Sequence, residues 1–101
     1  KLAKDIKIAC YGLSFKSNID DLRESPSVVI AQEIISMHSG LVMLVEPNIS
    51  EVPDNLNRAS LVQFDVALST ADVHVLLVDH DEFKGKCPAT GRVIDTRGIW
   101  K

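Results

Sequence analysis

Several features that would assign this chain to a common functional class are scarce or missing. No apolar run approaches the roughly 18 residues of a membrane span. The first five residues, KLAKD, lead straight into a strand-like pattern, so we expect neither a membrane helix nor a signal peptide. Basic residues are not in excess, because the formal net charge is −3. The charge therefore gives no reason to expect nucleic acid or an anionic membrane as a partner.

Cysteine is also scarce, with only Cys10 and Cys87 in the chain. The two are far apart and form no CxxC pair, which suits a reducing cytosol in which both stay free. We therefore expect a cytoplasmic protein. Cys10 lies among apolar residues within a predicted strand, where a thiol acts as a small hydrophobic group, so we do not expect it to be catalytic.

The glycine-rich phosphate loop of dinucleotide-binding domains is missing as well. Such a loop follows the first strand and reads GxGxxG, with the phosphate at the N-terminus of the next helix. Here the first strand leads into Gly12-Leu13-Ser14-Phe15-Lys16, which contains one glycine rather than three. We therefore do not expect this domain to hold NAD in the standard way.

What the chain does have is the composition of one globular domain. It contains 101 residues, of which 46% are hydrophobic and 25% charged, so we expect a single domain over residues 1–101. Four short apolar runs end in turn-forming residues and predict strands over 6–11, 41–45, 73–78 and 92–95. Ser25 and Pro26 predict the start of a helix over 26–39 that stops at Gly40. Residues 65–71 predict a shorter helix, and 47–58 a surface loop.

This order of elements predicts an α/β fold, a three-layer Rossmann-like open sheet that is mainly parallel. The second and third runs are apolar without alternation, as in strands buried on both faces. Right-handed crossovers favour the strand order 2-1-3-4, with the four runs numbered along the chain. Ligands of such sheets lie outside the carboxyl ends of the strands, where the order reverses. The loops over 12–23, 79–83 and 96–100 are therefore the candidate binding segments.

Two cations in these loops suggest a phosphate ligand. Lys16 follows the first predicted strand and Arg97 the last, so both should lie at the same edge of the sheet. A lysine is a point charge and an arginine a two-pronged donor, and the pair suits a diphosphate. Each charge-assisted hydrogen bond contributes about 1.5–3 kcal/mol. The nearby cluster Asp20, Asp21, Arg23 and Glu24 has the composition of a solvated loop.

The same residues carry a family resemblance. Residues 7–26 resemble the opening of the C-terminal domain of the UDP-glucose/GDP-mannose dehydrogenase family, which reads G-L-x-F-K, then D-D-x-R-x-S, then a helix. The similarity continues through 71–73, 79–83 and 94–98. It covers nearly the whole chain, and only residues 49–61 are featureless.

The resemblance implies a C-terminal fragment of a larger enzyme. In this family an N-terminal domain binds NAD, and a central helical linker mediates dimerisation and carries the catalytic cysteine. The C-terminal domain binds the UDP-sugar, whose C6 alcohol is oxidised to a carboxylate by two hydride transfers. By motif position, Phe15, Lys16 and Arg97 would contact UDP, and Arg23 would contact NAD across the domain interface. The fragment alone would then be inactive.

Two short segments are similar to one branch of the family. Residues 37–40, MHSG, and Glu46-Pro47-Asn48 resemble the UDP-N-acetylmannosamine dehydrogenases of bacterial surface-polysaccharide synthesis. UDP-N-acetylmannosamine is therefore the substrate that the resemblance favours.

Two other functions compete with this one. A flavodoxin-like phospho-acceptor module could use Asp79 as its acceptor, but the first strand ends in Gly12-Leu13-Ser14 without the acids that would hold Mg²⁺. A ligand-free adaptor domain would leave Lys16 and Arg97 without a role. We do not expect a metal site in residues 79–82, because adjacent side chains seldom converge on one ion.

Overall fold

The fold is an open sheet of five parallel strands. The computed structural model describes residues 3–14, 22 and 25–100, so Phe15, Lys16 and Arg23 lie outside the described residues. The strands are β1 (Ile8–Tyr11), β2 (Val42–Val45), β3 (Ser60–Leu61), β4 (Val73–Leu76) and β5 (Arg92–Asp95), in the spatial order β3-β2-β1-β4-β5. Every neighbouring pair is parallel. The predicted α/β class and the order of the four predicted strands are confirmed.

The prediction of four strands was wrong, because β3 extends the sheet beyond β2. β3 has two residues, pairs with Met43 and Leu44 of β2, and continues through a bond from Val62 N to Leu44 O of 2.8 Å. So short a strand gives no periodic signal. The predicted surface loop over 47–58 also contains the 3-10 helix η2 (Asp54–Leu56), whose Leu56 is buried against the α1 side of the sheet. Leu56 and Ala59 of this segment are buried, and Ile49, Val52 and Leu61 pack against the same cluster.

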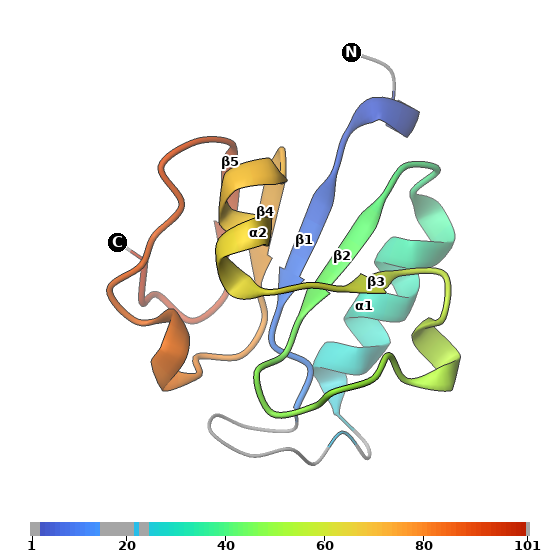
Figure 1. Cartoon of the computed structure of the whole chain (residues 1–101), viewed down its shortest axis with the longest axis horizontal. Helices are drawn as coiled ribbons and strands as arrows, with labels where there is room; N and C mark the ends of the chain where they lie inside the picture. The colour runs from blue at the N-terminus through green and yellow to red at the C-terminus, as the bar shows by residue number, and fades with distance from the viewer. Residues whose placement is uncertain (1–2, 15–21, 23–24, 101) are drawn as a thin grey trace.

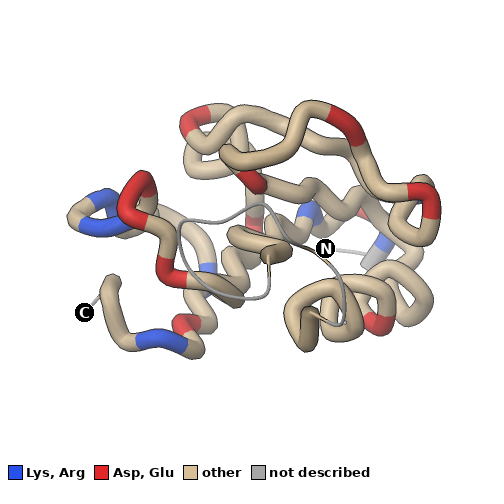
Figure 2. The backbone as a smooth tube through the Cα atoms, turned by 90° about the horizontal axis from the view of Figure 1, so that it is seen from below, with Lys and Arg blue, Asp and Glu red and all other residues tan. Residues whose placement is uncertain are grey.

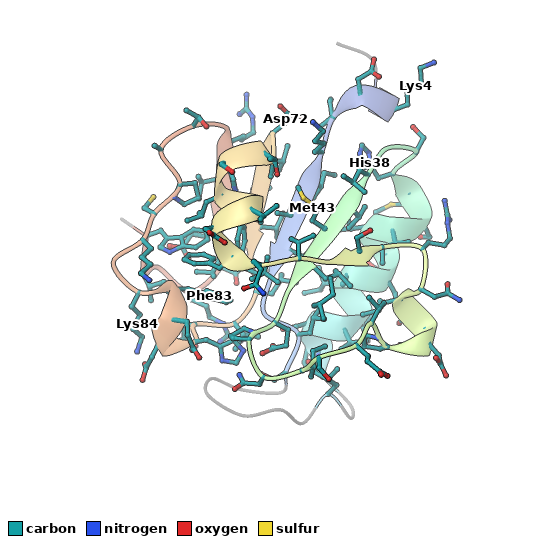
Figure 3. The ribbon with its side chains drawn as sticks, viewed as in Figure 1. Lys4, His38, Met43, Asp72, Phe83 and Lys84 are labelled. Carbon is teal, nitrogen blue, oxygen red and sulfur yellow. The ribbon has the colours of Figure 1, made fainter. Side chains whose placement is uncertain are left out.

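The first helix, α1 (Pro26–Met37), begins where the sequence predicts. Pro26 occupies the first helical turn, and Val28, Ala31 and Ile35 are buried at helical spacing. The helix ends before the predicted Gly40. Its C-cap is His38, which has an extended backbone and whose N–H donates to Ile34 O. The His38 ring lies toward the start of β1, with Nε2 2.7 Å from Ile6 O, and this bond fixes the helix end against the sheet (Figure 3).

The two helices cover opposite faces of the sheet, which gives the three predicted layers (Figure 1). The second helix, α2 (Phe64–Thr70), lies in front of the sheet in this view and α1 lies behind it. Alternate residues of β1 separate accordingly: Cys10 packs with the α1 cluster, and Ala9 and Tyr11 pack with the α2 cluster. Neither described helix is long and apolar enough to cross a membrane.

Aromatic side chains dominate the α2 face around Tyr11. The Tyr11 ring contacts Phe64, Phe83 and Trp100 edge-to-face, with centroid separations of 5.1–5.8 Å. Its hydroxyl donates to His74 Nδ1 at 2.6 Å, and His74 Nε2 donates to Thr90 O at 3.0 Å. Burial lowers the pKa of His74, so the ring stays neutral in this network. His74 is therefore a buried histidine with a hydrogen-bond partner at each ring nitrogen, as its place in a strand predicts.

Candidate functional site

The candidate site lies at the carboxyl edge of the sheet, where the order reverses between β1 and β4. The arrowheads of β1 and β4 point toward this edge in Figure 1. Backbone hydrogen bonds join the strand ends there: Gly12 N to Val45 O at 2.7 Å, Leu77 N to Tyr11 O at 2.9 Å and Thr96 N to Leu76 O at 3.3 Å. The segments that follow β1, β2, β4 and β5 are therefore held side by side.

Arg97 follows β5 in a turn that Asp95 organises. The Asp95 carboxylate accepts hydrogen bonds from the N–H groups of Arg97, Gly98 and Trp100, at 2.9, 2.7 and 2.8 Å. The Arg97 Nε donates to Leu77 O, just beyond the end of β4, at 3.0 Å. These bonds direct the guanidinium from β5 toward the reversal point. The predicted position of Arg97 at this edge is what the structure shows.

Trp100 anchors the chain after Arg97. Its indole is buried on the α2 face at 5.1 Å from the Tyr11 ring, and its Nε1 donates to Phe83 O at 2.8 Å. Phe83, which is labelled in Figure 3, belongs to the 3-10 helix η3 (Asp81–Phe83) that follows β4. Arg97 is therefore held between a turn on one side and a buried aromatic anchor on the other.

The Arg97 side chain is exposed and available to an anion. Among the residues that the structure describes, no carboxylate forms a salt bridge with it, and its one hydrogen bond uses Nε. The two terminal nitrogens can therefore present donors to a ligand. Figure 2 looks at this edge from below and shows basic positions at left, in the segment after β4 and close to the C-terminus.

The other three predicted contacts cannot be placed in the same way. Phe15, Lys16 and Arg23 lie outside the described residues, so the convergence of Lys16 with Arg97 stays a prediction. The described residues on either side of this segment are joined. Ser25 Oγ donates to Leu13 O at 2.8 Å and lies 3.1 Å from Ser14 O. Ser25 takes the predicted N-cap position, but its hydroxyl binds these carbonyls rather than a helix N–H.

Gly12 has a packing role at this edge. Its φ of 96° is in the left-handed region, and a Cβ added there would lie 2.5 Å from Val78 Cβ and 2.9 Å from Val78 N. The backbone after β1 thus passes directly over the chain after β4. Contact with Val78 therefore requires glycine at position 12, without any role in phosphate binding.

A buried contact between Glu46 and His80, which the sequence does not predict, lies at this edge. Glu46 follows β2, and its Oε1 lies 2.9 Å from His80 Nε2. Glu46 is 3% exposed and His80 is fully buried. The sequence places Glu46 in a segment typical of one family branch and His80 in a candidate binding segment, but nothing in it pairs the two. The available signal was an acid placed directly after an entirely apolar strand.

An open groove of about 900 Å³ lies on the α2 side of Glu46. Its walls come from the segments after β2, β3 and β4, with Phe64 and Phe83 as aromatic walls and Glu82 and Lys86 as charged ones. Lys86 Nζ lies 5.9 Å from the centroid of the Phe64 ring. Arg97, the one predicted ligand residue that the structure describes, does not line this groove.

The cysteines take no part in the site. Burial raises the pKa of the Cys10 thiol to about 12, so it carries no thiolate near neutral pH, in line with its predicted structural role. Cys87 is exposed and its thiol is free.

Comparison with known proteins identifies a family for this arrangement. Residues 9–101 match the UDP binding domain of the UDP-glucose/GDP-mannose dehydrogenase family. A UDP-N-acetyl-D-mannosamine dehydrogenase of Salmonella typhi is 52% identical over the whole chain, which covers 25% of that protein. An NDP-N-acetyl-D-galactosaminuronic acid dehydrogenase of Ralstonia nicotianae is 49% identical over 96% of the chain and 24% of its own length. The chain thus spans about a quarter of these relatives.

A solved structure shares the fold. A UDP-glucose dehydrogenase from the archaeon Pyrobaculum islandicum aligns with a TM-score of 0.79 at 20% identity, over 95% of this chain and 23% of the other.

Proposed function

Because this chain belongs to the UDP-glucose/GDP-mannose dehydrogenase family, as its UDP binding domain, we propose that Arg97 binds the diphosphate of a UDP-sugar at the carboxyl edge of the sheet. The observation that carries the proposal is the placement of Arg97. An exposed guanidinium, fixed by the Asp95 turn and by Leu77 O, points to the reversal point of a parallel sheet. Ligands of open α/β sheets bind at such points. Phe15 and Lys16 complete the site in this proposal, on the sequence pattern alone.

The whole enzyme, in the same proposal, is an NAD-dependent UDP-sugar 6-dehydrogenase. This chain binds the UDP part of the substrate. The rest of the protein contains the NAD-binding domain, the catalytic cysteine and the dimer interface. Arg23 would reach NAD across the domain boundary. NAD itself would supply the hydride acceptor, and no residue described here takes part in that step. Free cysteines suit a cytoplasmic enzyme.

The proposed sugar is N-acetylmannosamine. The Glu46-Pro47-Asn48 segment supports this choice, since it resembles that branch of the family. Identity alone does not decide between sugars, because relatives named for two different N-acetylated sugars match at 52% and 49%. No observation favours the phospho-acceptor alternative. The Glu46 carboxylate contacts the N–H groups just after β1, but its oxygens are already bound by protein donors.

Titration of the chain with UDP, UMP and uridine tests the proposal. We expect UDP to bind with a Kd on the order of 1 mM or tighter, as two to three phosphate contacts would give. UMP should bind more weakly because it lacks the β-phosphate, and uridine should bind most weakly because it lacks both phosphates. Chemical shifts in the ¹⁵N-labelled chain give the three affinities. Equal affinities for UDP and uridine would rule out a diphosphate site.

A further inference from the structure

The buried carboxylate of Glu46 accepts hydrogen bonds from several groups at the carboxyl edge. Its Oε1 accepts from Leu13 N at 2.8 Å, Ser14 N at 3.1 Å and His80 Nε2 at 2.9 Å. Its Oε2 accepts from the backbone N–H of Asn48 at 3.1 Å and from Asn48 Nδ2 at 3.0 Å. One buried carboxylate therefore joins the segments that follow β1, β2 and β4.

The backbone N–H groups of Leu13 and Ser14, which both donate to Glu46 Oε1, directly follow β1. In dinucleotide-binding sheets, the N–H groups after the first strand bind phosphate, and an acid after the second strand binds the ribose hydroxyls. Here the acid after β2 has turned inward and bonds the N–H groups after β1. Consecutive backbone N–H groups form an anion-binding concavity. In this chain a protein carboxylate fills it, so a bound phosphate would meet occupied donors and a like charge.

Hydrogen bonds stabilise the negative charge of the Glu46 carboxylate although the side chain is buried. Burial raises the pKa of Glu46, but hydrogen bonds from His80, Leu13 and Asn48 outweigh that effect, and the pKa lies below its ordinary value. A carboxyl with a lowered folded-state pKa stabilises the fold above its ordinary pKa and loses that contribution as the pH falls through the folded-state value. At neutral pH the group is therefore an anion.

We propose that Glu46 is a built-in anion that occupies the backbone anion site after β1 and, with His80, positions the chain leaving β1 so that UDP binds beside it. The first part stands on the contacts of Glu46 alone, and the second rests on the proposed function. His80 Nε2 donates to Glu46 Oε1, and Ser14 Oγ lies 3.2 Å from the same nitrogen. Ser25 holds the carbonyls of Leu13 and Ser14 from the other side. The backbone that enters the predicted binding loop is thus fixed through both its N–H and its C=O groups.

A pH titration of the unmodified chain tests whether Glu46 occupies the anion site after β1. As the pH is lowered, the amide protons of Leu13 and Ser14 should shift with the midpoint of the Glu46 side-chain carboxyl, below the ordinary value for glutamate. The reason is that protonation weakens the acceptor they share. Amide and carboxyl signals of the ¹⁵N,¹³C-labelled chain report both groups. If the two amides stay unchanged while Glu46 titrates, the anion site is refuted.

Substitution tests the positioning role. Glu46→Gln keeps the shape but removes the charge. We expect UDP affinity to fall by about tenfold, because the backbone that enters the binding loop loses its charged acceptor, a change on the order of one charge-assisted hydrogen bond. Glu51→Gln, the same change at an exposed acid a few residues further on, should leave UDP affinity unchanged. Glu46→Ala should regain both UDP affinity and the Leu13 and Ser14 amide signals when acetate is added. A purely structural role would not respond to acetate.

The outcomes separate this inference from the proposed function. If UDP binds the unmodified chain and Glu46→Gln equally well, the positioning role fails and the proposed function stands. If UDP does not bind the unmodified chain, the proposed function fails and the positioning role with it. The anion site is then still decided by the Leu13 and Ser14 amides, whose pH titration and acetate response need no UDP.

Discussion

Replacing Gly12 with alanine is expected to lower the free energy of unfolding by about 3 kcal/mol or more. A residue with a Cβ in the left-handed region costs roughly 1–2 kcal/mol. The added Cβ would also lie 2.5 Å from Val78 Cβ and 2.9 Å from Val78 N, so the chain after β1 or the chain after β4 must move. Overpacking of this kind costs a further ~1–3 kcal/mol. Urea unfolding of Gly12→Ala and the unmodified chain measures the difference.

The control is Gly85→Ala, which has the same conformational cost without the collision. Gly85 has a φ of 76°, and a Cβ built there meets nothing within 4 Å. We expect it to cost only the ~1–2 kcal/mol of backbone strain. Equal losses in the two variants would show that contact with Val78 is not what requires glycine at position 12.

Replacing Arg97 with alanine is expected to weaken UDP binding by ~10–100-fold, the value of one charge-assisted phosphate contact. In the intact dehydrogenase, kcat/KM for the UDP-sugar should fall by a similar factor. The fold should be little affected, because the Asp95 turn is made by backbone N–H groups and Trp100 keeps its own bonds. UDP titration of the variant, with its unfolding curve, separates lost binding from lost stability.

Arg92→Ala is the matched control, since Arg92 begins β5 and Arg97 follows its end. Arg92 is an exposed arginine at the opposite end of β5, where its backbone N–H donates to Asp72 O. Its removal changes the net charge by the same amount but leaves the carboxyl edge intact. Equal losses of UDP affinity in the two variants would point to a general charge effect and contradict a specific role for Arg97.

The parts of the fold that the sequence could predict are those with a strong local pattern. The apolar runs at β1, β2, β4 and β5 and the Ser25-Pro26 helix start gave the sheet, its order and α1, because buried parallel strands and helix N-termini restrict composition. β3 was missed because two residues show no period. The end of α1 was placed too late, because packing of His38 against Ile6 O ended the helix before Gly40.

In the candidate site, too, the sequence predicts only those residues whose position follows from a local pattern. Arg97 could be placed because it directly follows a strand, and the edge of a parallel sheet is fixed once the strands are known. The Glu46–His80 pair could not be found, since its members are 34 positions apart and meet only when β2 and β4 pack on either side of β1. Pairings of this kind depend on tertiary geometry. A single sequence does not display them.

The most direct measurement is to locate UDP on the ¹⁵N-labelled chain by its chemical-shift changes. The account predicts that the largest changes fall at the carboxyl edge, at Leu77, Arg97 and Gly98 and in the segment after Gly12. The residues at the opposite edge, around Asp72 and Arg92, should not respond. Changes centred on that opposite edge, or none at saturating UDP, would contradict the claim that this edge binds the nucleotide's phosphates.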